Sequence, residues 1–498
     1  MRQTKFLLGY DIGSSSIKAS LLETDTGKEA GASISPKKEM GMISVQSGWA
    51  EQEPEDWWNH LKIATKELLA ESGATPEDIG AIGISYQMHG LVAVDKQQQV
   101  VRPSIIWCDS RASEIGNKAF REIGPEACLK QFLNSPGNFT ASKLKWVQEN
   151  EPEVYSRIDK MMLPGDYIAM KLSGTVSTTV SGLSEGILWD FQSDSLAGKL
   201  LEYYGISEDL IPKALPSFAI HGEVTKEAAR EVGLKEGTKI AYKAGDQPNN
   251  AFSLNVLHPG EVAATAGTSG VVYGISDEPE YDEKSRVNTF VHVNHSAKQS
   301  RYGVLLCVNG TGILNSWLKQ NLGLGNELTY DEMNHIASSV PIGSDGVTIL
   351  PFGNGAERIL ENRDLGAQIV DLRFNRHQTA HLFRAAQEGI VFALHYGFQI
   401  MGQMGMKMQT VKAGHANMFF SPIFREAFVN TTGATLELYN TDGALGAARG
   451  AGVGSGIYKK HEEAFETLSL IESIEPDTYK QTQYNEAYQR WVEKLQSQ

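Results

Sequence analysis

The chain has 498 residues, a length that predicts two large domains or three ordinary ones. Hydrophobic residues make up 41% and charged residues 21%, a globular composition that excludes a disordered or fibrous chain. Lys and Arg number 45 against 60 Asp and Glu, a net charge of −15. This charge argues against a nucleic-acid partner, because phosphates would meet net repulsion.

Cysteine usage and apolar runs indicate a cytoplasmic protein without membrane attachment. Cys108, Cys128 and Cys307 are too few and too scattered for a disulfide framework or a zinc cluster. The apolar run before Asp11 is too short for a signal peptide. The uncharged stretch 389–406 approaches the length of a membrane span, but its Gly, His and Gln residues predict a buried helix instead.

The first half of the chain opens with a strand, a glycine turn and a second strand. Apolar runs at 6–10 and 17–22 flank the segment DIGSSS. From Pro54 to about Gly73, the spacing of apolar residues predicts an amphipathic helix. Two short strands follow at 81–86 and 91–95. Mixed helix and strand signals predict α/β architecture.

A similar pattern begins again near residue 240, with strand-like runs at 239–246 and 261–276. We therefore expect a domain boundary near residue 250, dividing the chain into domains 1–250 and 251–498. A long amphipathic helix is predicted at 378–401. The Gly- and Ala-rich run 442–456 resembles a phosphate loop, but its spacing favours a tightly packed helix.

Two turns have the composition of phosphate-binding loops, one in each half. The first contains Asp11, the small residues 13–16 and Lys18, so backbone amides and hydroxyls could approach a phosphate while the carboxylate holds magnesium. The second, AGTSG at 266–270, contains Gly267 and Thr268. Either turn alone could be an ordinary hairpin turn. Together they suggest two lobes that hold one polyphosphate.

Asp246 ends an apolar run and is followed by Gln247, Pro248 and two Asn residues. A carboxylate here could accept a proton from a substrate hydroxyl, and the amides could bind neighbouring hydroxyls. The alternative is a helix N-cap, where Asp is common. With its ordinary pKa of about 3.9, the carboxyl would be ionised at neutral pH.

Two further segments are candidates for ligand binding. Met88 and His89 follow the strand 81–86, at a strand end where α/β proteins often form sites, although a lone His is more often structural. The segment 413–417, with Gly414 and Asn417, could let a flat base lie against the backbone. A simple loop explains it equally well.

Taken together, these segments resemble the FGGY carbohydrate kinases of the actin/hexokinase/Hsp70 superfamily, and most closely the members that phosphorylate xylulose. The resemblance spans roughly residues 5 to 455. It depends on the motifs SGWAEQEPEDWW, YQMHG, VVRPSIIWCDSRA, SPGNFTASKLKWVQENEP and LPGDYIAMKLSGTVSTTVSG, which occur in the family's order. Such a series is specific for the family and less decisive about the sugar.

The resemblance implies two RNase-H-like lobes with a cleft between them, with sugar mainly on the N-terminal lobe and ATP mainly on the C-terminal lobe. It implies that Asp246 is the catalytic base, that Asp11 and Asp246 lie near Mg²⁺, and that sugar and nucleotide are the small-molecule partners. The sugar-binding residues would be Met88, His89, Asp246 and Gln247. The ATP-binding residues would be Gly13, Ser14, Ser15, Ser16, Lys18, Gly267, Thr268, Gly312, Gly414 and Asn417.

The leading hypothesis is ATP-dependent phosphorylation of D-xylulose to D-xylulose 5-phosphate. The chain departs from the family pattern at four places. Gln247 stands where xylulose kinases usually have Asn, which bears on substrate choice, and Ala413-Gly414-His415 replaces the usual Gly-Gly-Gly, which could tighten the base pocket. Trp107-Cys108-Asp109 replaces the usual Trp-Asn-Asp, and the segment 354–359 is altered. The alternatives are a kinase for ribulose, glycerol or gluconate and, from another class, a nucleotide switch of the actin/Hsp70 kind. A homodimer is left open.

Overall fold

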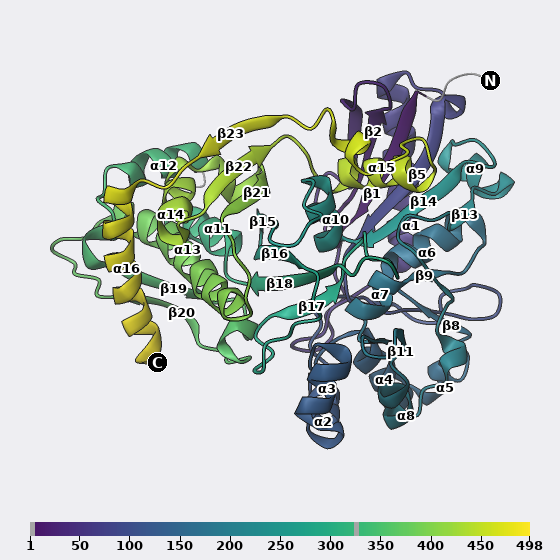
Figure 1. Ribbon diagram of the computed structural model, residues 1–498, viewed down its shortest axis with the longest axis horizontal. Coiled ribbons are helices and arrows are strands. Elements are labelled where there is room, and N and C mark those ends of the chain that lie inside the picture. Colours follow the sequence, from purple (N-terminus) through teal and green to yellow (C-terminus); the bar gives the residue numbers. More distant parts are fainter. Residues whose placement is uncertain (1–4, 323–327) are drawn as a thin grey trace.

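The computed structural model describes residues 5–322 and 328–498 and contains two large β-sheets with flanking helices (Figure 1). The first sheet runs in the order β13 (Gly222–Glu223), β14 (Lys239–Gly245), β5 (Ile79–Tyr86), β1 (Phe6–Ile12), β2 (Ile17–Glu23) and β3 (Glu29–Ser35). The second runs in the order β17 (Asn288–Val291), β18 (Tyr302–Val308), β16 (Gly270–Ser276), β15 (Val262–Ala266), β21 (Thr410–Gly414), β22 (Thr435–Tyr439) and β23 (Leu470–Ile474). The predicted α/β class is confirmed.

The centre of the first sheet consists of three parallel strands. β5 lies between β1 and β14 and is parallel to both, whereas β2 is antiparallel to β1 and forms the predicted hairpin with it. In this register Asp11 is level with Ser85, and Gly245 is level with Tyr86. The residues that follow these three strands therefore emerge along one edge of the sheet.

Alternation along β1 places different helices on the two faces of this sheet. Leu8 packs in a core cluster with residues of α1 (Pro54–Ser72) and α6 (Pro164–Ser173), whereas Leu7 packs against α15 (Gly443–Gly454). The predicted helix from Pro54 is confirmed, and so is the packed helix within 442–456. A Cβ on Gly83 of β5 would lie 1.9 Å from the Ala447 carbonyl oxygen, so the run of small residues lets α15 lie directly on the strands.

The second sheet has one face covered by α13 (Thr379–Gln403) and α14 (Pro422–Thr432), and the predicted long helix is confirmed. Val304 and Leu306 of β18 point into that core. Leu305, between them, belongs to a cluster that also contains residues of the first half of the chain, including Leu144 and Leu254. The two halves therefore share a continuous apolar core.

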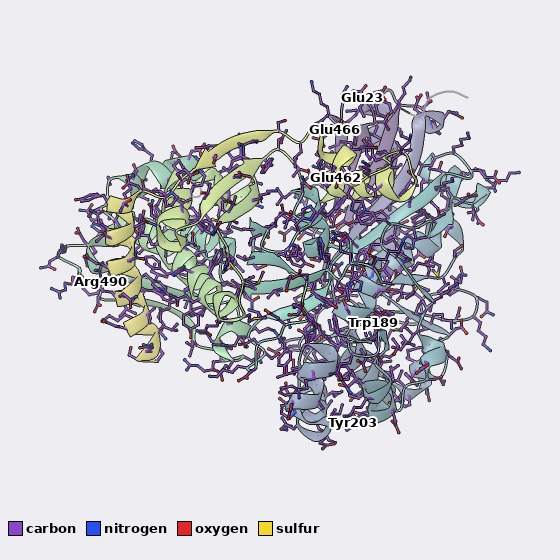
Figure 2. All side chains as sticks on the ribbon, in the orientation of Figure 1. Glu23, Trp189, Tyr203, Glu462, Glu466 and Arg490 are labelled. Atoms are coloured by element: carbon purple, nitrogen blue, oxygen red, sulfur yellow. The ribbon has the colours of Figure 1, made fainter. Side chains whose placement is uncertain are left out.

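The segment after α15 stays beside the first sheet before the chain returns to the second. Figure 2 shows Glu462 and Glu466 near Glu23 at the end of β2. The Tyr458 hydroxyl donates a hydrogen bond to the Thr24 carbonyl oxygen at 3.3 Å. The chain then forms β23 and the C-terminal helix α16 (Thr478–Gln496), on the opposite side of the molecule (Figure 1).

The remaining longer helices lie around these two sheets. In the first half they are α2 (Ser113–Ile123), α3 (Pro125–Phe132), α4 (Thr140–Asn150), α5 (Pro152–Tyr155), α7 (Val180–Glu185), α8 (Gly198–Tyr204), α9 (Lys226–Val232) and α10 (Asp246–Ser253). In the second half they are α11 (Gly312–Leu322) and α12 (Tyr330–Ser338). None of the helices in the described residues has both the length and the apolar character needed to cross a membrane.

The shorter elements pair locally. The strands are β4 (Glu51–Gln52), β6 (Val92–Val94), β7 (Ser104–Ile105), β8 (Lys160–Met162), β9 (Thr178–Thr179), β10 (Trp189–Asp190), β11 (Ser195–Leu196), β12 (Ala214–Leu215), β19 (Thr348–Phe352) and β20 (Gly366–Val370). Of these, β4 pairs with β7 and β6 with β8. An isolated bridge between Leu91 and Ile105 places the end of β7 beside the segment that follows β5.

Candidate active site

The carboxyl edge of the first sheet collects the polar residues that the sequence singled out in the first half. Asp11 is the penultimate residue of β1, Met88 and His89 follow β5, and Asp246 follows β14 as the first residue of α10. Parallel strand ends are a common place for α/β binding sites. Gly245 is the N-cap residue of α10, so Asp246 does not take the N-cap position that the alternative interpretation gave it.

The Asp11 carboxylate lies beneath the first residue of α15. One of its oxygens accepts a hydrogen bond from the Ser85 hydroxyl at 2.9 Å. A Cβ on Gly443 would lie 2.3 Å from the other oxygen, so the helix passes directly over the carboxylate. Burial raises the pKa of Asp11 to about 6, and the negative charge of Asp442 contributes, whereas the Ser85 hydrogen bond opposes the rise.

Asp246 lies close enough to Asp11 for the two carboxylates to affect each other. Burial raises the pKa of Asp246 to about 7, and the charge of Asp11 adds to this rise. Hydrogen bonds from the backbone and side chain of Gln247 oppose it. The expectation that Asp246 is fully ionised at neutral pH was therefore wrong for the ligand-free protein, because the sequence shows neither the burial nor the second acid.

His89 is held as a neutral ring whose hydrogen-bonding roles can be assigned. Its Nδ1 lies 2.9 Å from the Glu185 carbonyl oxygen, which can only accept, so Nδ1 carries the proton. Burial, reinforced by the nearby charge of Lys143, lowers the pKa of His89 to about 3. The other ring nitrogen, Nε2, is then an acceptor that suits a substrate hydroxyl. Phe139 packs edge-on against the ring, with centroids 4.8 Å apart.

Glu185, at the end of α7, is a site residue that the sequence did not reveal. Its side chain and that of Met88 both pack against Gly245, immediately before Asp246. Burial raises the pKa of Glu185 well above its usual range, and the charge of Asp246 adds to the effect. Asp246 and Glu185 therefore place two carboxyl groups with raised pKa values side by side in this part of the site.

The turn between β1 and β2 is closed by a hydrogen bond from the Gly13 amide to the Ser16 carbonyl at 3.0 Å. Ser14 receives a hydrogen bond from the Trp107 indole at 3.3 Å, which ties the turn to the segment after β7. Lys18, on β2, donates a hydrogen bond to Asp442, the N-cap residue of α15. Its ammonium group therefore already has a carboxylate partner beside the turn.

The second turn and the residues predicted to bind nucleotide come together in the other sheet. The amides of Gly312 and Ile313, at the start of α11, donate to the carbonyl oxygens of Gly267 and Thr268, at 2.9 and 3.2 Å. The side-chain amide of Asn417 lies against Gly267. The structure thus brings together the predicted residues of the β15–β16 turn and of α11.

The two halves meet where α10 approaches α15. The Asn249 side-chain amide donates to the Gly443 carbonyl oxygen at 2.8 Å, and the Ser253 hydroxyl donates to the Asp442 carbonyl at 2.8 Å. Gly414, at the end of β21, lies against the Thr441 carbonyl that precedes this contact. The contacts of α10 with Asp442 and Gly443 therefore link the helix that begins at Asp246 to Gly414, a residue predicted to bind nucleotide.

A magnesium ion fits the chemistry of this region. Asp11 and Asp246 are two buried carboxyl groups with raised pKa values, and the negative charge of Asp11 contributes to the rise at Asp246. A divalent cation would offset this charge. Mg²⁺ is usually held by one or two carboxylates together with substrate phosphates and water. Within residues 5–322 and 328–498, no group of three or more His, Cys, Asp or Glu side chains could hold a metal ion.

Comparison with known families decides how the geometry is to be interpreted. Residues 6–253 match the N-terminal domain of the FGGY family of carbohydrate kinases, and residues 262–455 match its C-terminal domain. This chain belongs to the FGGY family. As a family member it is a phosphotransferase that acts on a sugar-type alcohol, with the two-lobed fold of the actin/hexokinase type.

Individual relatives cover almost the whole FGGY chain. The xylulose kinase of Bacillus subtilis (strain 168) is 29% identical over 468 residues, covering 93% of this chain and 91% of that protein. The L-xylulose/3-keto-L-gulonate kinase of Escherichia coli (strain K12) is 29% identical over 506 residues, covering 98% and 96%. The ligand-bound xylulose kinase of Lactobacillus acidophilus has a similar fold, with a TM-score of 0.89, 21% identity and 99% and 98% coverage.

The domain boundary near residue 250 stays a prediction. The two family matches meet between residues 253 and 262, but α15 lies within the second match and packs on the first sheet. The roles given to individual side chains likewise stay predictions. The geometry brings the sugar-side residues to one sheet edge. Of the ten nucleotide-side residues, five lie at or next to the turn between β1 and β2, and the other five lie around the β15–β16 turn, the start of α11 and the end of β21.

Proposed function

We propose that this FGGY kinase transfers the terminal phosphoryl group of ATP to the 5-hydroxyl of D-xylulose, giving D-xylulose 5-phosphate and ADP. The observation that carries the proposal is the position of Asp246 directly after Gly245, against which the Met88 side chain packs. Met88 and the adjacent His89 match the ketose-contacting pair of xylulose-phosphorylating members. Relatives named xylulose kinase, which cover nearly the full length, support the same sugar.

In this mechanism Asp246 accepts the proton of the 5-hydroxyl as its oxygen forms a bond to the terminal phosphorus. The bond between that phosphorus and the ADP oxygen breaks, and ADP leaves with the electron pair. Phosphoryl transfer depends mainly on positioning and charge stabilisation. A base whose pKa is raised to about 7 suits the task, because it binds the proton well at the pH where it is still partly ionised.

The remaining residues position the two substrates. His89, with Nε2 as an acceptor, would bind one sugar hydroxyl, and Met88 would pack against the carbon chain. The backbone amides and hydroxyls of residues 13–16 and of the β15–β16 turn would contact the phosphates, and Gly312, Gly414 and Asn417 would border the adenosine. Asp11 and Asp246 would hold Mg²⁺. When bound, magnesium would neutralise charge on the phosphate oxygens.

A second candidate substrate class has one observation in its favour. Gln247 replaces the Asn usual in xylulose kinases, and its side chain hydrogen-bonds Asp246, so a change at this position alters the environment of the base. The pairing resembles that of glycerol kinases, and a relative of equal identity is named for L-xylulose and 3-keto-L-gulonate. A polyol or sugar-acid substrate is therefore the alternative to D-xylulose.

A substrate panel with an ADP-coupled assay tests the proposal. D-xylulose, L-xylulose, D-ribulose, glycerol and gluconate would be compared at equal ATP and magnesium concentrations. The proposal predicts the highest kcat/KM for D-xylulose and little ATP turnover without sugar. A higher value for another acceptor would assign the protein to that substrate. Substantial ATP turnover that no acceptor increases would favour a nucleotide switch instead.

A further inference from the structure

Lys143, in the first turn of α4, is a fully buried lysine that no part of the proposed mechanism uses. Its ammonium group donates to the His89 carbonyl oxygen at 2.8 Å and to the Ile106 carbonyl oxygen at 2.9 Å. No ion pair within residues 5–322 and 328–498 includes it. Burying a charged group without a direct carboxylate partner costs free energy. The two hydrogen bonds from Lys143 to backbone carbonyl oxygens therefore indicate that this lysine has a specific role.

Both acceptors belong to loops on the sugar side of the proposed site. His89 has a φ of 61°, in the left-handed region that non-glycine residues rarely adopt. Such a conformation persists only where the surroundings hold it. Ile106 precedes Trp107, whose indole donates to Ser14 in the first turn. One ammonium group thus joins the His89 loop to the loop that contacts the proposed phosphate turn.

The same helix also supports the ring of His89. Phe139, the N-cap residue of α4, packs edge-on against the imidazole, and its carbonyl oxygen accepts a hydrogen bond from the Lys143 amide at 3.0 Å. On the other side of the imidazole, Nδ1 donates to the Glu185 carbonyl. The backbone, the ring face and one ring nitrogen of His89 are therefore all fixed by contacts, and only Nε2 is left as an acceptor.

We propose that Lys143 is a positioning residue that holds His89 in its left-handed conformation, so that Nε2 points at the acceptor sugar. This inference rests on the proposed function, since it assigns a purpose to the geometry of the same site. Lys143 does not touch the sugar. It acts through the His89 and Ile106 carbonyl oxygens, and its loss affects sugar binding more than nucleotide binding.

The test uses the full-length protein and the sugar that wild type phosphorylates best. Lys143→Met removes the ammonium group and keeps the side-chain length. Lys143→Gln keeps N–H donors for the carbonyl oxygens. Leu144→Ala is the matched control, because Leu144 is the next residue of α4 and is also fully buried. It weakens the packing of the helix without touching the His89 carbonyl. Thermal unfolding shows whether each variant is folded.

We expect Lys143→Met to raise the KM for sugar about tenfold, while the KM for ATP changes less than about twofold. Lys143→Gln should give an intermediate value. Leu144→Ala should lower the unfolding temperature with little effect on either KM. If Lys143→Met does not fold, the comparison of Lys143→Gln with Leu144→Ala still decides, and an unchanged sugar KM in Lys143→Gln then overturns the inference.

A double-mutant cycle separates positioning from general support. If Lys143 acts through the His89 side chain, adding Lys143→Met to His89→Ala should change the sugar KM less than about twofold. Effects that simply multiply would overturn the inference. Failure of the proposed function looks different, because wild type would then phosphorylate no sugar in the panel. An unchanged sugar KM in Lys143→Met, with an active wild type, rejects only the role of Lys143.

Discussion

At the scale of single residues, surroundings decide what the carboxyl groups of this chain can do. Burial raises the pKa of Asp11, Asp246 and Glu357 to about 6, 7 and 7. Glu357, fully buried, accepts hydrogen bonds from the Asn309 and Gly310 amides at 3.0 to 3.3 Å and so holds the turn that leads into α11. Three acids of ordinary sequence appearance therefore titrate near neutral pH.

The substitution Glu357→Gln should change how the free energy of unfolding depends on pH. The wild-type pKa is 4.5 unfolded and about 7 folded, so the folded state favours the protonated acid. The stability that Glu357 contributes through this difference in pKa is fully present below about pH 4.5 and is lost as the pH rises through 7. Between about pH 5 and pH 8, wild type should lose roughly 2 kcal/mol relative to the variant in urea unfolding. A difference in unfolding free energy between wild type and variant that does not change with pH would contradict the raised pKa of Glu357.

At the scale of secondary-structure elements, α15 is the clearest case of a pattern that predicts structure but not position. Its run of Gly and Ala predicts a packed helix, and the structure confirms one. The pattern does not indicate that this helix lies on the first sheet, with Gly443 against Asp11 from the opposite end of the sequence. Small residues permit close approach to any strand, so the partner strand is not encoded locally.

Gly443→Ala should disturb the site through Asp11. The added methyl group would lie 2.3 Å from a carboxylate oxygen, so the carboxylate or the helix must shift, and we expect kcat to fall at least about tenfold. Gly198→Ala is the matched control, because Gly198 is also the first residue of a helix and nothing lies near its added methyl group. It should retain full activity. Equal activity in both variants would show that Asp11 tolerates displacement.

At the scale of the whole molecule, the sequence predicts the strands and their ends better than the contacts between them. Asp11, Met88, His89 and Asp246 were found because each lies at the end of an apolar run, and parallel strands bring such ends to one edge. The predicted helices at 54–73 and 378–401 agree with α1 and α13 because both have an apolar face. Local patterns were sufficient for these features.

Lys143 and Glu185 were not found, because their significance depends on tertiary contacts. A single Lys or Glu within a helix reads as an exposed residue in sequence, and only the fold shows that both are buried beside the His89 loop. The resemblance to a family supplied the roles of Met88 and His89, but not the groups that hold them. Local sequence patterns likewise did not predict how the chain passes between its two halves.

The central claim is that Asp246 accepts the proton of the sugar hydroxyl, and turnover of Asp246→Asn tests it most directly. The variant is nearly isosteric, so it should remain folded and bind sugar and ATP with affinities close to wild type. Its kcat for the preferred sugar should fall about a thousandfold, since the amide cannot accept the proton. Asp25→Asn, at an exposed turn, should be fully active. Near-normal turnover in a folded Asp246→Asn protein would contradict the account.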